Sequence, residues 1–161
     1  MSKNKTVKRG EQIFLSTPIS KAINPETGLL HSKTAVKINR IFDLLTMEGY
    51  NIFLAIDIEK WGRQKVTSVE CTKRDYDELV KSKHLVAIVS DYISDGVLIE
   101  LGWASAHKIP ITIIADYRMN LSHLVLGLPS ISDAKIYQVD WKNDELFLNT
   151  IFNERGISIS Q

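Results

Sequence analysis

The sequence predicts an α/β fold in which helices cover both faces of a mostly parallel β-sheet. Short apolar segments rich in β-branched and aromatic residues alternate along the chain with segments that repeat apolar residues at helical spacing. Several of the short segments are apolar at consecutive positions, which is typical of strands buried on both faces of a parallel sheet. About five such strands, in the order 2-1-3-4-5 with helices on either side, make a three-layer, flavodoxin-like architecture the expected one.

Five segments are predicted to be strands, the fifth by a weaker pattern. They are residues 12–16, 51–56, 84–90, 110–116 and 134–139. Four longer segments are predicted to be helices, and a short fifth helix is expected within 118–128. The four are residues 33–48, 72–82, 97–107 and 143–153. Residues 57–70 form a longer connection than most strand-to-helix loops, which favours a functional role for them.

The composition is that of one soluble globular domain spanning residues 1–161. The 20 Lys and Arg residues nearly balance the 19 Asp and Glu residues, which argues against a nucleic-acid polymer or an anionic membrane as partner. Residues 1–10 are expected to be a flexible, solvated start. No apolar segment has the length of a membrane span or of a signal peptide's apolar region, so the cytoplasm is the expected location. The single cysteine, Cys71, has no metal-ligand or redox spacing around it.

Acidic residues cluster where the predicted strands end and the following helices begin. Ligands of such sheets bind beyond the carboxyl ends of the strands, near the point where the strand order reverses. The acids at this edge are Asp57, Glu59, Asp75, Asp91, Asp95 and Asp116. Asp95, which precedes Gly96, also suits a turn or a helix cap, and Asp75 also suits a helix start, where a carboxylate complements the helix dipole. Their number at one edge, rather than any single position, favours a site.

Glu100 stands out because it lies within an apolar and small-residue stretch, residues 94–108. If a helix begins near Gly96, the carboxylate lies in or just beyond the first turn, where free N–H groups and the helix dipole favour the ionised form by a few tenths to about 1 kcal/mol. A fixed, ionised and partly desolvated carboxylate is what a covalent glycosyl acceptor requires. An exposed Glu100 that only complements the helix dipole explains the same pattern, and both interpretations stay open at this point.

The loop after the first predicted strand offers hydroxyl groups at the same edge. Ser16 and Thr17 could hold a sugar, the edge of a base or a phosphate, whereas a capped turn shaped by Pro18 is the alternative. The loop is not a glycine-rich phosphate cradle, so a nucleoside triphosphate or a dinucleotide is not indicated. Trp61 could stack on a base. None of the four histidines has the spacing of a metal site or a partner for a Ser or Cys triad, so no metal is expected.

Taken together, these residues resemble the nucleoside 2-deoxyribosyltransferase superfamily over roughly residues 11–125. The most specific stretch is IELGWASAHKIPITII, which resembles the family's nucleophile helix and the strand that follows it. Four further stretches resemble, in chain order, the first strand with its substrate loop, an acid-bearing helix, the acid loop before the nucleophile, and a segment that reaches a neighbouring subunit. They are IFLSTPIS, TKRDYDELVKSKHLVAIV, DYISDG and RMNLSHL.

The resemblance implies a role for each matched residue. Glu100 would be the nucleophile that attacks C1′ of the sugar and forms a covalent glycosyl-enzyme intermediate. Asp95 would help to protonate or orient the departing base, although it lies one residue closer to Glu100 than the family's acid does. Asp75 or Tyr76 would contact the base, and Asn120 would be supplied by a partner subunit, so that activity requires a homo-oligomer. The remaining expected substrate contacts are Ser16, Thr17, Pro18, Asp57, Trp61 and Gly96.

The expected activity is cleavage of the N-glycosidic bond of a nucleoside or a nucleoside 5′-monophosphate without a cofactor. A second base as acceptor gives transfer, and water gives hydrolysis. Nucleotide hydrolases of the superfamily carry a glycine- and arginine-rich loop after the first strand, and its absence here favours other members. A non-catalytic sensor of a nucleotide or ribosyl ligand is the alternative, and a flavin-binding electron carrier also suits the hydroxyl-rich loop. A phosphoacceptor receiver domain is excluded, because no acid ends the first strand.

Overall fold

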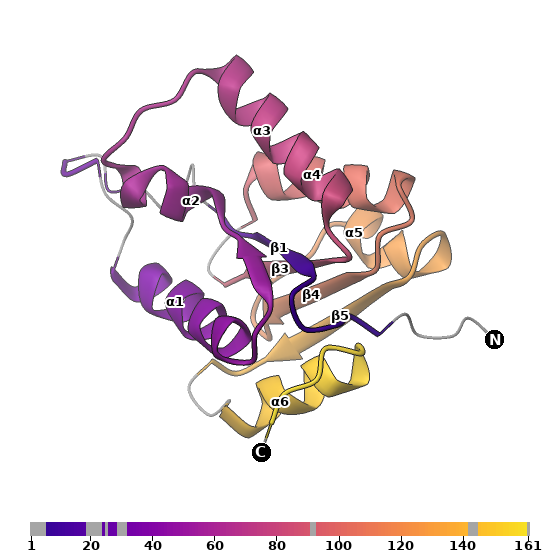
Figure 1. Cartoon of the computed structure of the whole chain (residues 1–161). Helices are drawn as coiled ribbons and strands as arrows, with labels where there is room; N and C mark the ends of the chain where they lie inside the picture. Colours follow the sequence, from indigo (N-terminus) through magenta and orange to yellow (C-terminus); the bar gives the residue numbers. More distant parts are fainter. Residues whose placement is uncertain are drawn as a thin grey trace.

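The computed structural model describes residues 6–18, 24, 26–28, 32–90, 93–141 and 145–160. A five-stranded sheet forms its centre (Figure 1). The strands are β1 (Gln12–Ser16), β2 (Asn51–Phe53), β3 (His84–Val89), β4 (Ile111–Asp116) and β5 (Ala134–Val139). They are arranged in the order β2-β1-β3-β4-β5, and each of the four strand pairs is parallel. The predicted fold class and strand order are therefore confirmed, with a sheet that is parallel throughout.

Helices cover both faces of the sheet. They are α1 (Ser32–Met47), α2 (Ala55–Ile58), α3 (Ser68–Lys81), α4 (Asp95–Ala106), α5 (His123–Gly127) and α6 (Glu145–Glu154), with 3-10 turns η1 (Lys60–Gly62) and η2 (Leu128–Ser130). One apolar core lies between the sheet and α1 with α6, and a second lies between the sheet and α3, α4 and α5. Figure 1 shows α1 and α6 on one side and α3 to α5 on the other.

The alternation of side chains along each strand decides which face a residue at the carboxyl edge reaches. In β1, Leu15 packs into the α1/α6 core and Phe14 into the α3/α4/α5 core, so Ser16 lies on the α3/α4/α5 face. In β4, Ile114 packs into the α1/α6 core, so Asp116 lies on the face of α1 and α6. The acids predicted at this edge are therefore divided between the two faces.

The segment between β2 and α3 differs from the prediction. The apolar run that predicts a strand over 51–56 leaves the sheet after Phe53, and Ala55 begins the short helix α2. The connection predicted over 57–70 contains η1 and the first turn of α3. Helix α3 begins at Ser68 because Thr67 and Glu70 form a capping box, in which each side chain accepts a hydrogen bond from the other residue's backbone. Asp75 consequently lies inside the helix and not at its start.

Helix α4 also begins earlier than predicted. The side chain of Ser94 caps it by accepting a hydrogen bond from the backbone N–H of Val97. Ser94, rather than Asp95, is thus the cap, and Glu100 lies in the second turn. The start of the chain also differs from the prediction. Val7 is buried and forms a β-bridge with Ile157, so the flexible start predicted for residues 1–10 does not include Val7. Residues 1–5 lie outside the described part.

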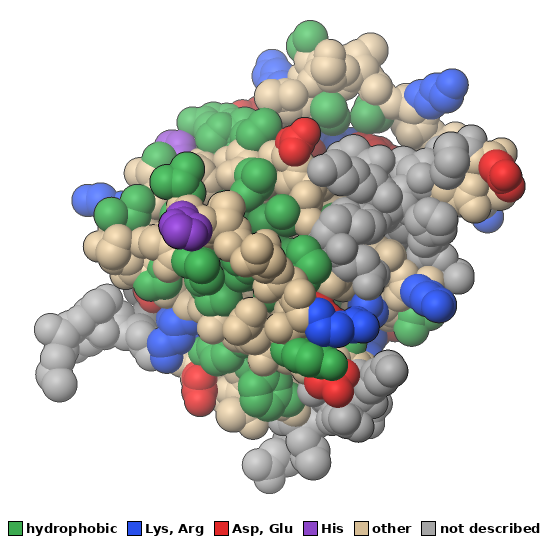
Figure 2. All heavy atoms as spheres, turned by 180° about the vertical axis from the view of Figure 1, so that it is seen from behind, with side chains coloured by type: hydrophobic (Ala, Val, Ile, Leu, Met, Phe, Trp, Pro, Cys, Tyr) green, Lys and Arg blue, Asp and Glu red, His purple; other side chains and the backbone are tan. Residues whose placement is uncertain are grey.

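The face that carries α4 and α5 is apolar. Figure 2 views this face, on which hydrophobic side chains gather while charged side chains lie mostly toward its margin. The exposed apolar side chains of these two helices include Leu98, Ile99, Leu124 and Leu126. Within the described ranges, no helix combines the length and the hydropathy that crossing a membrane would require.

Candidate active site

Glu100 lies where α4 passes the carboxyl end of β1. It is half-buried, and its Oε2 accepts a hydrogen bond from the hydroxyl of Ser16, which is itself only 1% exposed. The contact joins the last residue of β1 to the second turn of α4, because Ser16 points to the α4 face of the sheet. The structure thus brings together two residues that the sequence places far apart in the chain but at one edge.

Burial raises the pKa of Glu100 to about 8. The negative charge of Asp75 raises the pKa further, whereas the hydrogen bond from Ser16 and the positive charge of Arg74 lower it. The carboxyl group is therefore mostly protonated at neutral pH. The expectation that the helix start keeps it ionised is wrong, because the dipole effect fades beyond the first turn and desolvation is the larger effect here.

Asp75 belongs to a chain of ion pairs beside Glu100. Arg74 contacts Asp75 Oδ1 with Nε at 2.8 Å and Glu59 Oε1 with Nη2 at 2.7 Å. All three side chains are largely buried, and burial raises the pKa of Asp75 while Arg74 opposes the rise. Arg74 was not predicted from the sequence. The sequence does show that Arg74 is next to Asp75, but it does not show that Arg74 pairs with Glu59, because that contact depends on the fold.

Among the residues that the structure describes, two buried hydroxyl groups at this edge have no hydrogen-bond partner. They are Thr17 Oγ1 and Ser90 Oγ, in residues 6% and 2% exposed. Thr17 follows β1 and Ser90 follows β3, and these strands are neighbours in the sheet. A buried hydroxyl without a partner is costly, so each is a candidate to bind a ligand. Ser90 was missed in the sequence, although a polar residue directly after an apolar strand is a recognisable signal.

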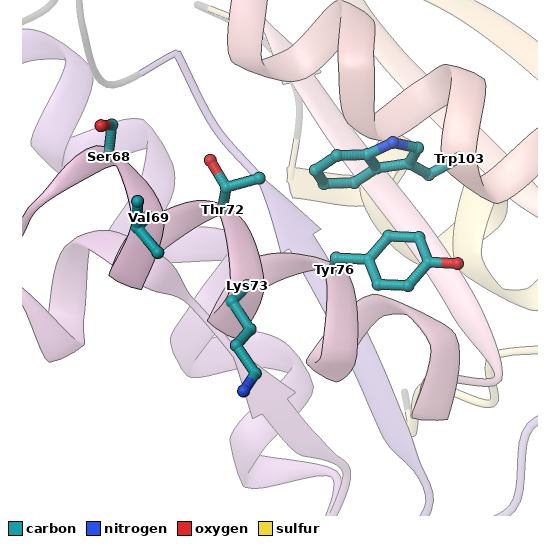
Figure 3. A pocket seen from close by; sticks show the side chains of 6 residues that line it. All are labelled: Ser68, Val69, Thr72, Lys73, Tyr76 and Trp103. Carbon is teal, nitrogen blue, oxygen red and sulfur yellow. The ribbon is translucent and has the colours of Figure 1, made fainter.

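Tyr76 lies on the outer side of the α3 and α4 pair. Its ring meets Trp103 edge to face at 5.2 Å between centroids, and its hydroxyl lies 2.9 Å from Nε2 of His107. Figure 3 shows the two rings side by side at one end of a groove of about 600 Å³ that continues along α3 past Thr72 and Val69. This groove has an apolar, aromatic end of the kind on which a flat ring can stack.

The other predicted site residues lie apart from this contact network. Asp95 and Gly96 are exposed in the first turn of α4, Asp57 is exposed on α2, and Asn120 is exposed in the loop before α5. Trp61 packs against the α1/α6 core. Pro18 is buried directly after Thr17, and Asp91 lies outside the described residues.

Metal-ligating side chains do not converge in the described part of the chain. No three His, Cys, Asp or Glu residues there are arranged to hold an ion. The carboxyl groups of Glu100, Asp75 and Glu59 are instead arranged around Ser16 and Arg74. Two neighbouring carboxyl groups with raised pKa values are an arrangement suited to acid–base and nucleophilic chemistry.

Comparison with known proteins gives structural but not sequence-level matches. No family model matches the chain, and no curated protein sequence matches it either. Among solved structures, BlsM has a TM-score of 0.74 at 28% identity, covering 93% of each chain. The CMP N-glycosidase BcmB of Clostridium botulinum has a TM-score of 0.66 at 20% identity, covering 88% of this chain and 99% of that one.

A third similar structure is the 2-deoxyribosyltransferase of the bacterium Bacillus psychrosaccharolyticus. Its TM-score is 0.62 at 15% identity, covering 93% of this chain and 99% of the other. Each match extends over almost the whole of both chains, so the shared fold is not confined to a common central sheet. The similarity that the sequence predicted is confirmed: this chain has the fold of the nucleoside 2-deoxyribosyltransferase-like superfamily.

Proposed function

We propose that this protein cleaves the N-glycosidic bond of a nucleoside or a nucleoside 5′-monophosphate, with Glu100 as the nucleophile. The observation that carries the proposal is the position of Glu100: half-buried, hydrogen-bonded by Ser16, and within electrostatic reach of Asp75 and Arg74. Two proteins of the same fold, a CMP N-glycosidase and a 2-deoxyribosyltransferase, support the substrate class.

The chemistry follows from the two carboxyl groups. Ionised Glu100 attacks C1′, the bond between C1′ and the base nitrogen breaks, and the departing base takes a proton from a neighbouring acid. We assign this acid to Asp75, whose pKa burial raises: the proton that Glu100 holds at neutral pH passes to Asp75 when the substrate binds, which leaves Glu100 ionised for the attack and Asp75 protonated for the departing base. Water or a second base then attacks C1′ of the glycosyl ester, which releases the product and restores the carboxylate. Asp95, exposed at the start of α4, is left to contact the substrate at the mouth of the site.

The unpartnered hydroxyls of Thr17 and Ser90 would donate to the substrate at this edge. Binding would then satisfy two buried polar groups that have no hydrogen-bond partner among the described residues. Pro18 fixes the chain next to Thr17, and Asp57, Trp61, Tyr76 and Gly96 remain proposed contacts at the rim of the site.

We also propose that the protein works as a homo-oligomer. The apolar face over α4 and α5 exposes Leu124 and Leu126 at 88% and 52%, and covering such a face would remove apolar surface from water (Figure 2). Asn120 is exposed in the loop that leads into α5, one of the two helices of this face. A second copy packed there would bring Asn120 toward the partner's site.

The test is incubation with a panel of nucleosides and 5′-monophosphates, with and without a second free base, followed by chromatography. Release of a base without an added base would identify a hydrolase, and release only with the second base would identify a transferase. No release from any compound of the panel would contradict the proposed activity.

A second candidate function, a non-catalytic sensor of the same ligands, is favoured by one observation. A nucleophile with a pKa of about 8 is mostly protonated, and therefore inactive, at neutral pH. A sensor would bind a nucleotide equally well after Glu100→Ala, with no base released by either protein. The enzyme would keep binding in this variant and lose turnover.

A further inference from the structure

The connection between α2 and α3 contains a sharp corner, and Glu59 lies at its start. The two residues that follow, Lys60 and Trp61, have left-handed φ angles of 51° and 57° although neither is glycine. This conformation is costly for a side chain other than glycine, and it persists where the surrounding structure fixes it. Trp61 provides such a contact, because it packs against the α1/α6 core. The corner therefore holds the backbone at Glu59 in a defined place.

From this corner, the Glu59 side chain reaches α3. Its Oε1 accepts a hydrogen bond from Arg74 Nη2 at 2.7 Å, while Arg74 Nε donates to Asp75 Oδ1 at 2.8 Å. The side chains of Arg74, Glu59 and Asp75 are only 20%, 14% and 16% exposed, so water and salt screen their charges weakly. One guanidinium group is thus shared between two carboxylates from different elements.

The sharing of Arg74 affects whether Asp75 can accept a proton. When Asp75 is protonated, Arg74 remains paired with Glu59, and the buried cation keeps a counter-charge. If Glu59 carried no charge, a proton on Asp75 would leave the guanidinium without an anionic partner, which is costly for a largely buried group. The second carboxylate therefore makes the protonated form of Asp75 more accessible.

Asp75 also has an oxygen atom that can hold the proton. Arg74 contacts Oδ1, whereas Oδ2 accepts no hydrogen bond within the described ranges. Among the described residues, the charged groups that act on Asp75 are Arg74 on the same helix, Glu59 at the end of α2, and Glu100 on α4. Burial and, to a smaller extent, Glu59 raise the pKa of Asp75, and Arg74 lowers it.

We propose that Glu59 is a positioning residue of the reaction: it holds Arg74, and through Arg74 it keeps Asp75 oriented and able to take up a proton. The inference rests on the proposed function, in which a proton passes from Glu100 to Asp75 and then to the departing base. The first transfer converts protonated Glu100 and ionised Asp75 into ionised Glu100 and protonated Asp75, so the total charge of the cluster is unchanged. Glu59 and Arg74 stay ionised throughout.

The experiment compares Glu59→Gln with Asp77→Asn. Each substitution removes one negative charge, but Asp77 is exposed on α3 and is not among the groups that shift the pKa of Asp75. An NMR titration of the Asp75 carboxyl carbon follows this pKa without any substrate. We expect Glu59→Gln to lower the pKa of Asp75 and Asp77→Asn to leave it unchanged. Arg74→Gln should raise it, because the cation that opposes the effect of burial is removed.

The pH–rate profile of base release links this titration to the reaction. In Glu59→Gln the falling limb, on which Asp75 loses its proton, should move to lower pH, and kcat above the wild-type optimum should fall by about tenfold. KM should stay within about twofold of the wild type, because Glu59 contacts Arg74 and has no proposed contact with the substrate. A general loss of structure would lower the rate at every pH and would not move the limb.

Thermal unfolding confirms that each variant is folded, and Glu59→Gln with its control remains informative if Arg74→Gln unfolds. With an active wild type, the inference alone is overturned by an unchanged Asp75 titration in Glu59→Gln, by an equal shift in Asp77→Asn, or by a rate loss without movement of the falling limb. A wild type that releases no base would instead contradict the proposed function, and with it the role of Glu59 in the reaction.

Discussion

The two edges of the central sheet differ in how they hold a buried charge. At the amino edge, the buried guanidinium of Arg155 donates to Thr112 Oγ1 at 3.2 Å, to the Ile111 carbonyl at 3.2 Å, and to the carbonyl and Oδ1 of Asp133 at 3.0 and 2.9 Å. His84, also buried, shares Thr112 with it through a 2.8 Å hydrogen bond, and burial lowers the pKa of His84 to about 3. The charge of Arg155 is thus compensated, whereas His84 is uncharged and its Nδ1 has no hydrogen-bond partner in the described part of the chain.

At the carboxyl edge the compensation is incomplete. Glu100 has the hydrogen bond from Ser16, but the nearby charge of Asp75 opposes its ionisation, and the hydroxyls of Thr17 and Ser90 have no partner within the described ranges. Ligand sites commonly contain such groups, because a bound substrate supplies the missing partners. The difference lies in the compensated charge of Arg155: we expect this residue to stabilise the fold, and we expect Glu100, whose ionisation is opposed by burial and by Asp75, to lower stability at neutral pH. The predictions below test this division.

The largest effect is expected at the amino edge. Arg155→Met leaves the carbonyls and Asp133 without their buried cation and should lower the free energy of unfolding by about 3–5 kcal/mol. The matched control is Arg9→Met, whose side chain is 62% exposed in its pair with Glu48 and should cost less than about 1 kcal/mol. Denaturant unfolding measures both. Equal effects of the two substitutions would show that the amino edge has no special part in stability.

The next largest effect is a gain in stability at the carboxyl edge. The Glu100 carboxyl has a pKa of about 8 in the folded protein and an ordinary value of 4.5. The folded state therefore holds a proton that the unfolded state loses, and wild-type stability falls as the pH rises from 4.5 to 8. Glu100→Gln removes this dependence and should be more stable than the wild type by on the order of 3 kcal/mol at pH 7.

Thermal and denaturant unfolding between pH 4 and pH 9 measure this gain. The variant and the wild type should converge near pH 4 and differ most above pH 8. Glu26→Gln, at an exposed position, is the control and should follow the wild type at every pH. A Glu100→Gln variant that is less stable than the wild type at pH 8 would contradict the picture of an uncompensated buried acid.

His84 should produce the opposite pH dependence. Its pKa is about 3 in the folded protein against an ordinary value of 6.5, so the unfolded state binds a proton that the folded state does not. Stability present above pH 6.5 is lost as the pH falls toward 3, by about 2–3 kcal/mol at pH 4.5. His84→Gln should reduce this acid-induced loss, whereas the exposed control His123→Gln should leave it unchanged. Identical acid unfolding of all three proteins would rule out His84 as the cause.

The smallest effect concerns Ser16. Its hydrogen bond lowers the pKa of Glu100, so Ser16→Ala should raise that pKa and shift the rising limb of the pH–rate profile to higher pH. At pH 7 the rate should fall by about tenfold, the effect of roughly one pH unit or 1.4 kcal/mol. Ser105→Ala, on the same helix, should change neither the rate nor the profile. A rate loss without any shift of the profile would assign Ser16 a role other than tuning Glu100.

Much of the fold could be predicted because apolar runs report burial directly. The bounds predicted for β1 and β5 agree with the structure, and those of β3 and β4 agree within one residue. The end of β2 could not be predicted, because Leu54 to Ile56 are buried in either conformation and their burial does not distinguish a strand from a helix. The start of α3 could have been predicted from the capping box of Thr67 and Glu70, but the prediction relied on the apolar periodicity, which begins later in the helix.

A residue of the candidate site could be predicted only where its own position in the sequence was enough to identify it. Glu100 was identified from its position in an apolar stretch, and Ser16 from its position at a strand end. Arg74 and Ser90 were missed because their roles depend on partners from other elements. The raised pKa of Glu100 could not be derived from the sequence, since desolvation depends on packing of the whole edge.

The central claim is that Glu100 performs the bond cleavage, and base release by Glu100→Gln tests it most directly. The rate for the best substrate of the panel is compared between this variant and the wild type, with both proteins shown to be folded by thermal unfolding. The account predicts a fall of about 10⁴-fold or more, together with the higher stability described above. A variant that releases the base at the wild-type rate would contradict the account.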